Sequence, residues 1–267
     1  MKNYTRTLLV ASAVFLSSLI AHADVWEDFD SLNNWNAYSA EEGALTPTVV
    51  SDAGEKYLKM ETEYTATTGL DRIGRIVTKV TYDDLNFATS AEPVSLAFED
   101  VSLVNTGRPG YLFIGLTTDG GSANLYNRTN SIYFQQVGDD EAYLVLRDGG
   151  TGGSGTQALW STNDSSKLSY DYSTISLVLT DTTWALGLYD ASGSELLNES
   201  GSMTVSSSNW ADGVYMSMTW QQSSNGSATS MFTMDSISLI PEPSGASLWM
   251  GVGCMFVIGM SGIRRRA

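Results

Sequence analysis

The middle of this 267-residue chain contains neither histidine nor cysteine. The only histidine, His22, falls in an apolar N-terminal segment (residues 1–23), and the only cysteine, Cys254, falls in a C-terminal one (residues 241–267). For the segment between them, residues 24–240, this excludes Ser-His-Asp and Cys-His catalytic centres, disulfides, and Cys/His sites for zinc or haem. Carboxylates, hydroxyls and amides remain, together with hard cations such as calcium that bind oxygen.

Basic residues are also scarce. The chain has 14 Lys and Arg against 30 Asp and Glu, a net charge of −16. Nine of the basic and 29 of the acidic residues lie in 24–240, so this segment carries −20. Such a charge opposes binding to nucleic acid or to an anionic membrane surface. The 217 residues of the segment are enough for one domain with its own core.

Residues 1–23 have the pattern of a signal peptide. Lys2 and Arg6 precede an apolar run over residues 8–20, and Ala21-His22-Ala23 has the small-x-small spacing that signal peptidase recognises. An N-terminal anchor helix is the alternative, but the run is short for a membrane span. We therefore predict cleavage before Asp24.

The C-terminal segment has three parts in a fixed order. They are Pro241-Glu242-Pro243, an uncharged stretch over residues 246–263, and Arg264-Arg265-Arg266. The 18 uncharged residues reach the lower limit for a transmembrane helix, and the three arginines would hold the C-terminus in the cytoplasm. A plain C-terminal anchor is one interpretation.

The same order resembles the PEP-CTERM sorting signal of Gram-negative bacteria. The resemblance implies transient anchoring by the helix and removal of the tail near residues 241–243 by a membrane enzyme of the exosortase type. It also implies export across the inner membrane to the cell envelope, the surface or the exterior, in a setting of extracellular polysaccharide. It implies nothing about the activity of residues 24–240.

Within 24–240 the hydrophobic pattern has period two. Alternating or mostly apolar runs separated by Gly, Asn, Asp and Ser predict strands over residues 94–98, 110–117, 131–137, 142–147, 175–180, 184–189, 214–220 and 231–239. The spacing predicts two hairpins, one joining 131–137 to 142–147 and one joining 175–180 to 184–189. We expect an all-β fold, an antiparallel β-sandwich or jelly roll, with helices only in the two end segments.

Three segments resemble concanavalin-like or laminin-G-like sandwiches. Residues 26–35 look like their first strand, residues 175–194 like a pair of neighbouring strands, and residues 234–239 like their last strand. The resemblance implies a fold that lectins, carbohydrate-binding modules and glycoside hydrolases share. It does not imply one activity among them.

Hydrolysis of a glycosidic bond needs two carboxylates that face each other across the bond. The Glu-x-Asp-x-x-Glu strand of sandwich hydrolases is absent from this chain. The nearest pair, Glu61 and Glu63, would share a strand face with Lys59 and is typical of a solvated surface. We therefore expect a non-catalytic protein, with a concanavalin-like glycoside hydrolase as an alternative.

A structural calcium ion is a further prediction, at the place where the first and last strands meet. In a continuous strand Asp235 falls on the same face as Ile237 and Leu239, so it points toward the core unless the strand bends. A buried carboxylate needs a partner or a metal. The predicted ligands are Glu27, Asp28, Asp30 and Asp235. A hydrogen-bonded or exposed Asp235 is the alternative.

Aromatic side chains provide a candidate sugar site. Trp184 and Trp220 fall on the same strand faces as their apolar neighbours and are predicted core residues. Trp160 and Trp210 lie in polar sequence predicted to form loops, over 157–163 and 206–212, and are freer to face solvent. The predicted ligand-binding residues are Trp160, Trp210, Tyr215 and Gln221, with local packing of the tryptophans as the alternative. The sequence thus predicts an exported protein that binds or organises extracellular polysaccharide. A purely structural surface or matrix protein is a second possibility.

Overall fold

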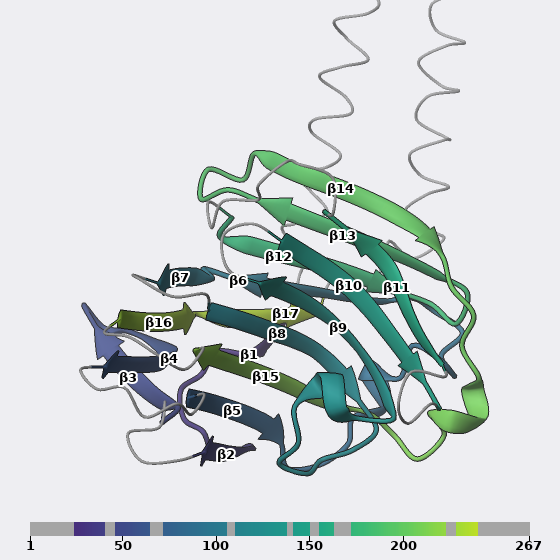
Figure 1. The fold of residues 1–267 in the computed structure, drawn as a ribbon, viewed down its shortest axis with the longest axis horizontal. Coiled ribbons are helices and arrows are strands. Elements are labelled where there is room, and N and C mark those ends of the chain that lie inside the picture. Colours follow the sequence, from purple (N-terminus) through teal and green to yellow (C-terminus); the bar gives the residue numbers. More distant parts are fainter. Residues whose placement is uncertain are drawn as a thin grey trace, which may run out of the picture. The chain divides into compact units, whose positions relative to one another are not determined.

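A computed structural model describes residues 24–40, 46–64, 72–105, 110–137, 141–149, 155–162, 172–222 and 228–239. In these ranges the chain forms strands and three short 3-10 helices, η1 (Asp83–Leu85), η2 (Leu125–Asn127) and η3 (Ser207–Asn209) (Figure 1). None of the helices in the described ranges is long and apolar enough to cross a membrane. The helices predicted in the two end segments, the cleavage site and the sorting tail all lie outside the described residues.

The strands of the described ranges form three sheets, and antiparallel pairings occur in all three. The seven-stranded sheet has the order β11 (Thr156–Ser161), β10 (Glu141–Asp148), β9 (Asn130–Val137), β8 (Gly110–Thr117), β15 (Tyr215–Gln222), β5 (Arg72–Thr78), β2 (Trp35–Ala40). The six-stranded sheet has the order β1 (Asp24–Glu27), β17 (Ser236–Leu239), β6 (Val94–Glu99), β12 (Thr174–Leu179), β13 (Thr183–Tyr189), β14 (Glu195–Ser202). The four-stranded sheet has the order β3 (Thr48–Asp52), β4 (Glu55–Tyr64), β16 (Ala228–Met234), β7 (Ser102–Asn105).

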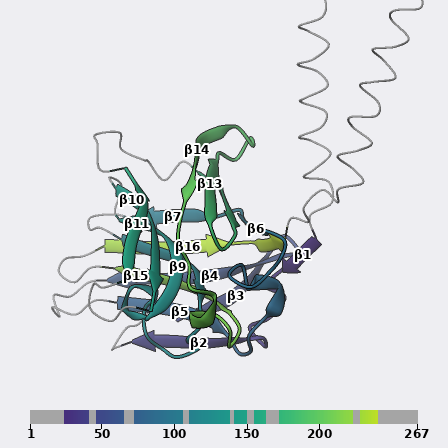
Figure 2. The same cartoon turned by 90° about the vertical axis from the view of Figure 1, so that its right-hand side faces the viewer.

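The main core lies between the seven-stranded sheet and the other two. Trp220 of β15 stacks on Phe232 of β16, with ring centroids 6.4 Å apart. Phe134 of β9 meets Tyr172, just before β12, edge to face at 6.0 Å. Figure 2 shows β9, β10, β11 and β15 on one side of the sandwich and β1 and β6 on the other. Trp184 and Trp220 are buried, as the sequence predicts.

The predicted hairpins are confirmed. β9 pairs with β10 and β12 pairs with β13, each in antiparallel register. The all-β antiparallel class is confirmed as well. β1 and β17 are neighbours in the six-stranded sheet, so the first and last strands meet, as expected.

The last strand differs from the prediction. It divides at Asp235 into β16 and β17, which belong to different sheets. The neighbouring chain segment divides in the same way into β6 and β7 at Asp100, whose φ of 51° is left-handed. The Asp235 amide donates to the Glu99 carbonyl at 3.1 Å across this break. The parity argument for Asp235 therefore ends at the bend, and the side chain is half-buried rather than in the core.

A second, smaller apolar cluster lies on the other side of the seven-stranded sheet. It contains Phe113, Leu125, Tyr133 and Val145, with Tyr111 and Tyr143 packed against it. Leu125 comes from residues 118–129, which connect β8 to β9 and which we call the covering loop. Both faces of β8, β9 and β10 are therefore buried in part, one by the main core and one by this loop.

Candidate functional site

We call the side of the seven-stranded sheet away from Trp220 and Phe134 the outer face. The strand register brings one residue from each of five neighbouring strands into a row across it: Arg75, Thr219, Phe113, Gln135 and Tyr143. Aromatic side chains gather on β8, β9 and β10, and polar ones on β5 and β15. The outer face is thus apolar over one half and polar over the other.

The apolar half is built on Phe113. Its ring lies 5.6 Å from that of Tyr126 in the covering loop and 5.9 Å from that of Tyr133. Tyr126 is 37% exposed, and Tyr111 and Tyr143 are half-buried. Flat aromatic faces that also carry a hydroxyl can contact the apolar face of a sugar ring and bond to its hydroxyls.

The polar half is a hydrogen-bond network. The Arg75 guanidinium donates from Nε to Thr219 Oγ1 at 3.1 Å and from Nη2 to Asn124 Oδ1. Asn124 in turn donates from Nδ2 to Gln221 Oε1 at 3.1 Å. Burial, and next the nearby charge of Arg128, lower the pKa of Arg75 to about 10. The network fastens the covering loop to β5 and β15.

Arg128 holds the covering loop from within. Its Nε donates to the Ala123 carbonyl at 2.8 Å and its Nη2 to the Gly121 carbonyl at 2.6 Å. The side chain is only 2% exposed, and this burial lowers the pKa of Arg128. Two guanidiniums, those of Arg75 and Arg128, therefore lie under one loop.

Two of the four predicted ligand-binding residues lie on the outer face. Tyr215 and Gln221 lie on the same face of β15 as Thr219. Tyr215 is half-buried and Gln221 is buried. Trp160 is half-buried on the edge strand β11, not in a loop. These three residues remain candidates for ligand contact.

Trp210 does not face solvent, and packing, the alternative given for it, is what the structure shows. Trp210 is 0% exposed, and its ring meets that of Phe87 at 4.8 Å. Its Nε1 donates to Asp148 Oδ1 at 3.0 Å. Phe87 and Asp148 are far from Trp210 in the chain, so the polar residues beside Trp210 in the sequence could not reveal its burial.

The four predicted calcium ligands do not form one group. The Glu27 carboxylate accepts from Trp35 Nε1 at 2.8 Å and from the Phe29 amide at 3.0 Å. Asp30 forms an ion pair with Lys56 at 2.7 Å. Across the described ranges, no three acidic, His or Cys side chains are grouped to hold a metal ion.

Asp235 nevertheless lies among acids. Burial raises the pKa of Asp235, and four nearby carboxylates raise it further: those of Asp100, Glu55, Glu99 and Asp28. The predicted pair Asp28 and Asp235 is therefore close enough to interact, while Glu27 and Asp30 are engaged elsewhere. Calcium binding stays a prediction.

The outer-face residues Tyr111, Tyr126, Tyr143, Arg75 and Arg128 were not predicted from the sequence. The sequence of β8 did indicate that both of its faces are covered, because apolar residues occupy both faces from Tyr111 to Leu116. A strand of this kind is covered on both faces. The partner strands and the covering loop could not be inferred from it.

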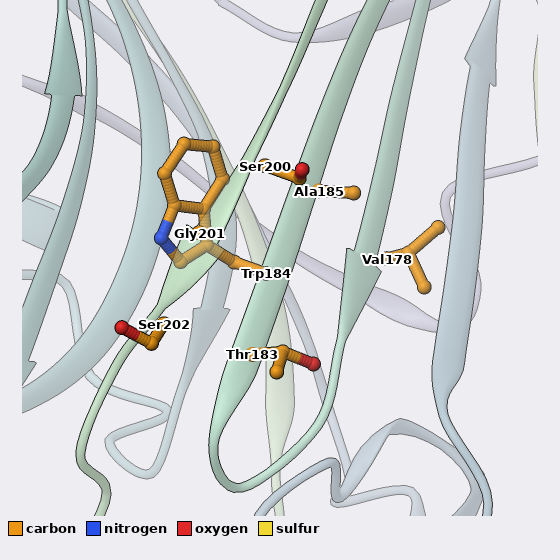
Figure 3. A pocket seen from close by; sticks show the side chains of 7 residues that line it. All are labelled: Val178, Thr183, Trp184, Ala185, Ser200, Gly201 and Ser202. Atoms are coloured by element: carbon orange, nitrogen blue, oxygen red, sulfur yellow. The ribbon is translucent and has the colours of Figure 1, made fainter.

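A pocket of about 410 Å³ lies on the six-stranded sheet, along β12, β13 and β14. Small side chains line it, including those of Val178, Ala185 and Ser200, as Figure 3 shows. The Trp184 ring lies against Gly201, where an added Cβ would be 2.9 Å from it. The pocket offers hydroxyls and methyl groups but no charged side chain, and its one aromatic ring, that of Trp184, is buried. It is therefore the weaker candidate site.

Neither a protein-family model nor a curated protein sequence matches the chain. Among solved structures, a legume lectin-like domain from Entamoeba histolytica matches with a TM-score of 0.50 and 10% identity, over 77% of this chain and 89% of that one. The fold is that of a lectin-like β-sandwich. The resemblance to concanavalin-like sandwiches is confirmed at the level of the fold, which is all that such low identity shows.

Two further structures match with lower scores. The catalytic domain of an endo-1,3-beta-glucanase (laminarinase) from Thermotoga petrophila has a TM-score of 0.48 and 12% identity, over 82% of this chain and 98% of that one. The carbohydrate recognition domain of Emp46p, in its metal-free form, has a TM-score of 0.47 and 13% identity, over 82% and 95%.

Proposed function

We propose that the outer face of this lectin-like sandwich binds extracellular polysaccharide without cleaving it. The observation that carries the proposal is the group of accessible tyrosines, Tyr111, Tyr126 and Tyr143, around Phe113. Beside them lies the half-buried amide of Gln135, which can donate to and accept from sugar hydroxyls. Aromatic surface next to paired polar groups is typical of carbohydrate sites.

The distribution of acids favours binding over hydrolysis. Within their described bounds, the strands of the seven-stranded sheet carry Asp or Glu at only two positions. These are Glu141 and Asp148, at opposite ends of β10. The Asp148 carboxylate already accepts from Trp210 Nε1, from Asn209 Nδ2 and from the Ser206 amide. A glycosidase needs a pair of free carboxylates facing each other in a cleft.

The proposed setting of the protein rests on its end segments. We propose that residues 1–23 direct export, and that residues 241–267 act as a PEP-CTERM signal for an exosortase-type enzyme. The support is the order Pro-Glu-Pro, apolar stretch and arginine cluster in the sequence. The domain would then work at the envelope or outside the cell, where polysaccharide is available.

Retention of the full chain on immobilised polysaccharides, in mild detergent, tests the proposal. The panel should hold β-glucan, galactan and polygalacturonate. We expect retention on at least one, and Tyr126→Ala should weaken it roughly tenfold because an exposed stacking platform is lost. The matched control is Tyr57→Ala, a half-buried tyrosine of the four-stranded sheet.

Three results would count against the proposal. Absence of retention on every polysaccharide would favour a purely structural surface protein. Equal losses for Tyr126→Ala and Tyr57→Ala would remove the outer face as the site. Release of reducing ends from a retained polysaccharide would favour the glycoside hydrolase alternative.

A further inference from the structure

In the part of the chain that the structure describes, three arginines of the outer face form no ion pair with a carboxylate, although Asp119 is near enough to Arg128 to oppose the lowering of its pKa. Arg75 and Arg128 are 6% and 2% exposed. Arg147, which lies on the same face of β10 as Tyr143, is half-buried. In the described ranges, both ion pairs belong instead to lysines, Lys56 with Asp30 and Lys59 with Glu61. This is unexpected in a segment with 29 acids and nine basic residues, because a buried charge is costly unless it is paired.

Two of these guanidiniums also hold N–H groups that no described residue accepts. Arg128 Nη1 and Arg147 Nε are buried, and none of the described residues accepts a hydrogen bond from them. Arg147 uses another N–H toward the Tyr133 side chain. A buried donor without a partner costs about 1–3 kcal/mol, more when it is charged, so an acceptor at these positions would stabilise the protein.

Tyr126 lies between these cations. It is close enough to Arg75 and to Tyr133, the partner of Arg147, to influence the pKa of each. Its ring sits over Phe113 of β8, and β8 lies between β5, which carries Arg75, and β10, which carries Arg147. The most exposed tyrosine of the outer face is thus flanked by positive charge from two sides.

We infer that the outer face binds an acidic polysaccharide, with a carboxylate of one sugar unit accepting a hydrogen bond from the half-buried Arg147 on one side of Tyr126 and a second carboxylate attracted by the charge of the buried Arg75–Arg128 pair on the other. A guanidinium matches a carboxylate in planar, two-bond geometry. This inference rests on the proposed function and names its ligand class.

The spacing requires a ligand of several sugar units. In the sheet order, four strand-to-strand steps separate β10 from β5, which amounts to roughly 19 Å at about 4.8 Å per step. A single uronic acid cannot reach both positions. A free carboxylate such as acetate offers no ring for Tyr126.

The net charge of the protein opposes a polyanion at long range. At physiological ionic strength of about 0.15 M, charges more than about 8 Å apart are largely screened. The contact with Arg147 and the attraction of the Arg75–Arg128 charges directly beneath the covering loop are short-range and persist. Binding should therefore be measured at this ionic strength rather than at low salt.

The test compares two ligands on the unmodified full chain. Titration calorimetry would measure binding of hexagalacturonate and of the same hexasaccharide after reduction of its carboxyl groups. We expect the reduced ligand to bind roughly tenfold or more weakly, because charge-assisted hydrogen bonds are lost. Monomeric galacturonate and acetate, at equal carboxylate concentration, should not compete.

Variants locate the effect. Arg147→Gln should lower hexagalacturonate affinity roughly tenfold and leave binding of the reduced ligand within about twofold. Lys79→Gln is the matched control, since it removes the same charge from an exposed position after β5 and should change neither affinity.

The outcomes separate this inference from the proposed function. Equal affinity for the two hexasaccharides, or preference for the reduced one, overturns the acidic ligand while polysaccharide binding stands. Competition by acetate also overturns it. Failure of every polysaccharide, neutral or acidic, overturns the proposed function itself. If Arg147→Gln does not fold, the comparison of the two ligands on the unmodified chain still decides.

Discussion

Asn124 donates from its side-chain Nδ2 to Gln221 Oε1 at 3.1 Å, across 97 residues of sequence. The same Asn124 accepts from Arg75 through its Oδ1. One amide thus joins the covering loop to two strands of the seven-stranded sheet. The loop that carries Tyr126 is positioned by this contact, so the tyrosine surface depends on it.

Asn124→Ala should lower the free energy of unfolding by about 1–3 kcal/mol, because Arg75 and Gln221 would each lose a buried partner. Urea denaturation of the full chain measures the change. Asn198→Ala is the control, an exposed residue of β14 whose amide bonds to Glu195, and it should stay within about 0.5 kcal/mol of the unmodified chain. A smaller loss for Asn124→Ala than for the control would contradict the role of the network.

Asp148→Ala should also be destabilising, by about 2–4 kcal/mol, since it removes the acceptor of three N–H groups, one of them from the buried Trp210 ring. Guanidinium unfolding followed by tryptophan fluorescence measures it. Asp181→Ala, in the exposed turn between β12 and β13, serves for comparison. An unchanged midpoint for Asp148→Ala would show that water replaces the carboxylate at no cost.

Asp190, in the turn between β13 and β14, should make the stability of the protein depend on pH in the acidic range. Hydrogen bonds from the Ser192 hydroxyl, and then from the Ser194 and Ser192 amides, lower the pKa of Asp190. A carboxyl with a lowered folded-state pKa stabilises the protein above its unfolded-state pKa of about 3.9 and loses that contribution as the pH falls through the folded-state value.

Asp190→Asn should therefore melt at a lower temperature than the unmodified chain at pH 7, and the difference should shrink as the pH falls below the unfolded-state pKa of about 3.9 and through the lower folded-state value. Thermal melts over a pH series show this directly. A difference that grows toward acid would have the wrong sign for a lowered pKa.

The predicted calcium ion can be tested at Asp235. Repulsion from Asp28, Glu55, Glu99 and Asp100 would fall if a cation bound among them. Millimolar calcium should then raise the melting temperature above its value in EDTA, by several degrees if binding is well below millimolar. Asp235→Asn should abolish the rise, and Asp181→Asn should leave it unchanged. No shift in the unmodified chain would end the calcium prediction.

The C-terminal prediction needs a host with an exosortase-type enzyme. There, mass spectrometry of the mature protein should show loss of the chain beyond residues 241–243, together with residues 1–23. Replacing Pro241, Glu242 and Pro243 by alanine should leave the tail attached and the protein in the membrane fraction. A mature protein that keeps its arginine cluster without those changes would favour the plain anchor.

Much of the fold followed from local pattern. Period-two alternation located the hairpins β9–β10 and β12–β13, because residues that alternate between two faces need a strand whatever lies around them. The parity of Trp184 and Trp220 identified two core residues for the same reason. The ion pair between Lys59 and Glu61, at 2.6 Å, also follows from spacing along one strand.

The sequence by itself therefore determined the all-β class, the exclusion of His- and Cys-dependent sites from residues 24–240, and the positions of many strands along the chain. The tertiary structure decided where Trp210 lies, where the last strand bends, and which side chains share the outer face. Each of these depends on partners far away in the chain: Asp148 for Trp210, Glu99 for Asp235, and Gln221 for Asn124. Burial and hydrogen bonding between distant segments have no period along a sequence, so only the folded chain brings them together.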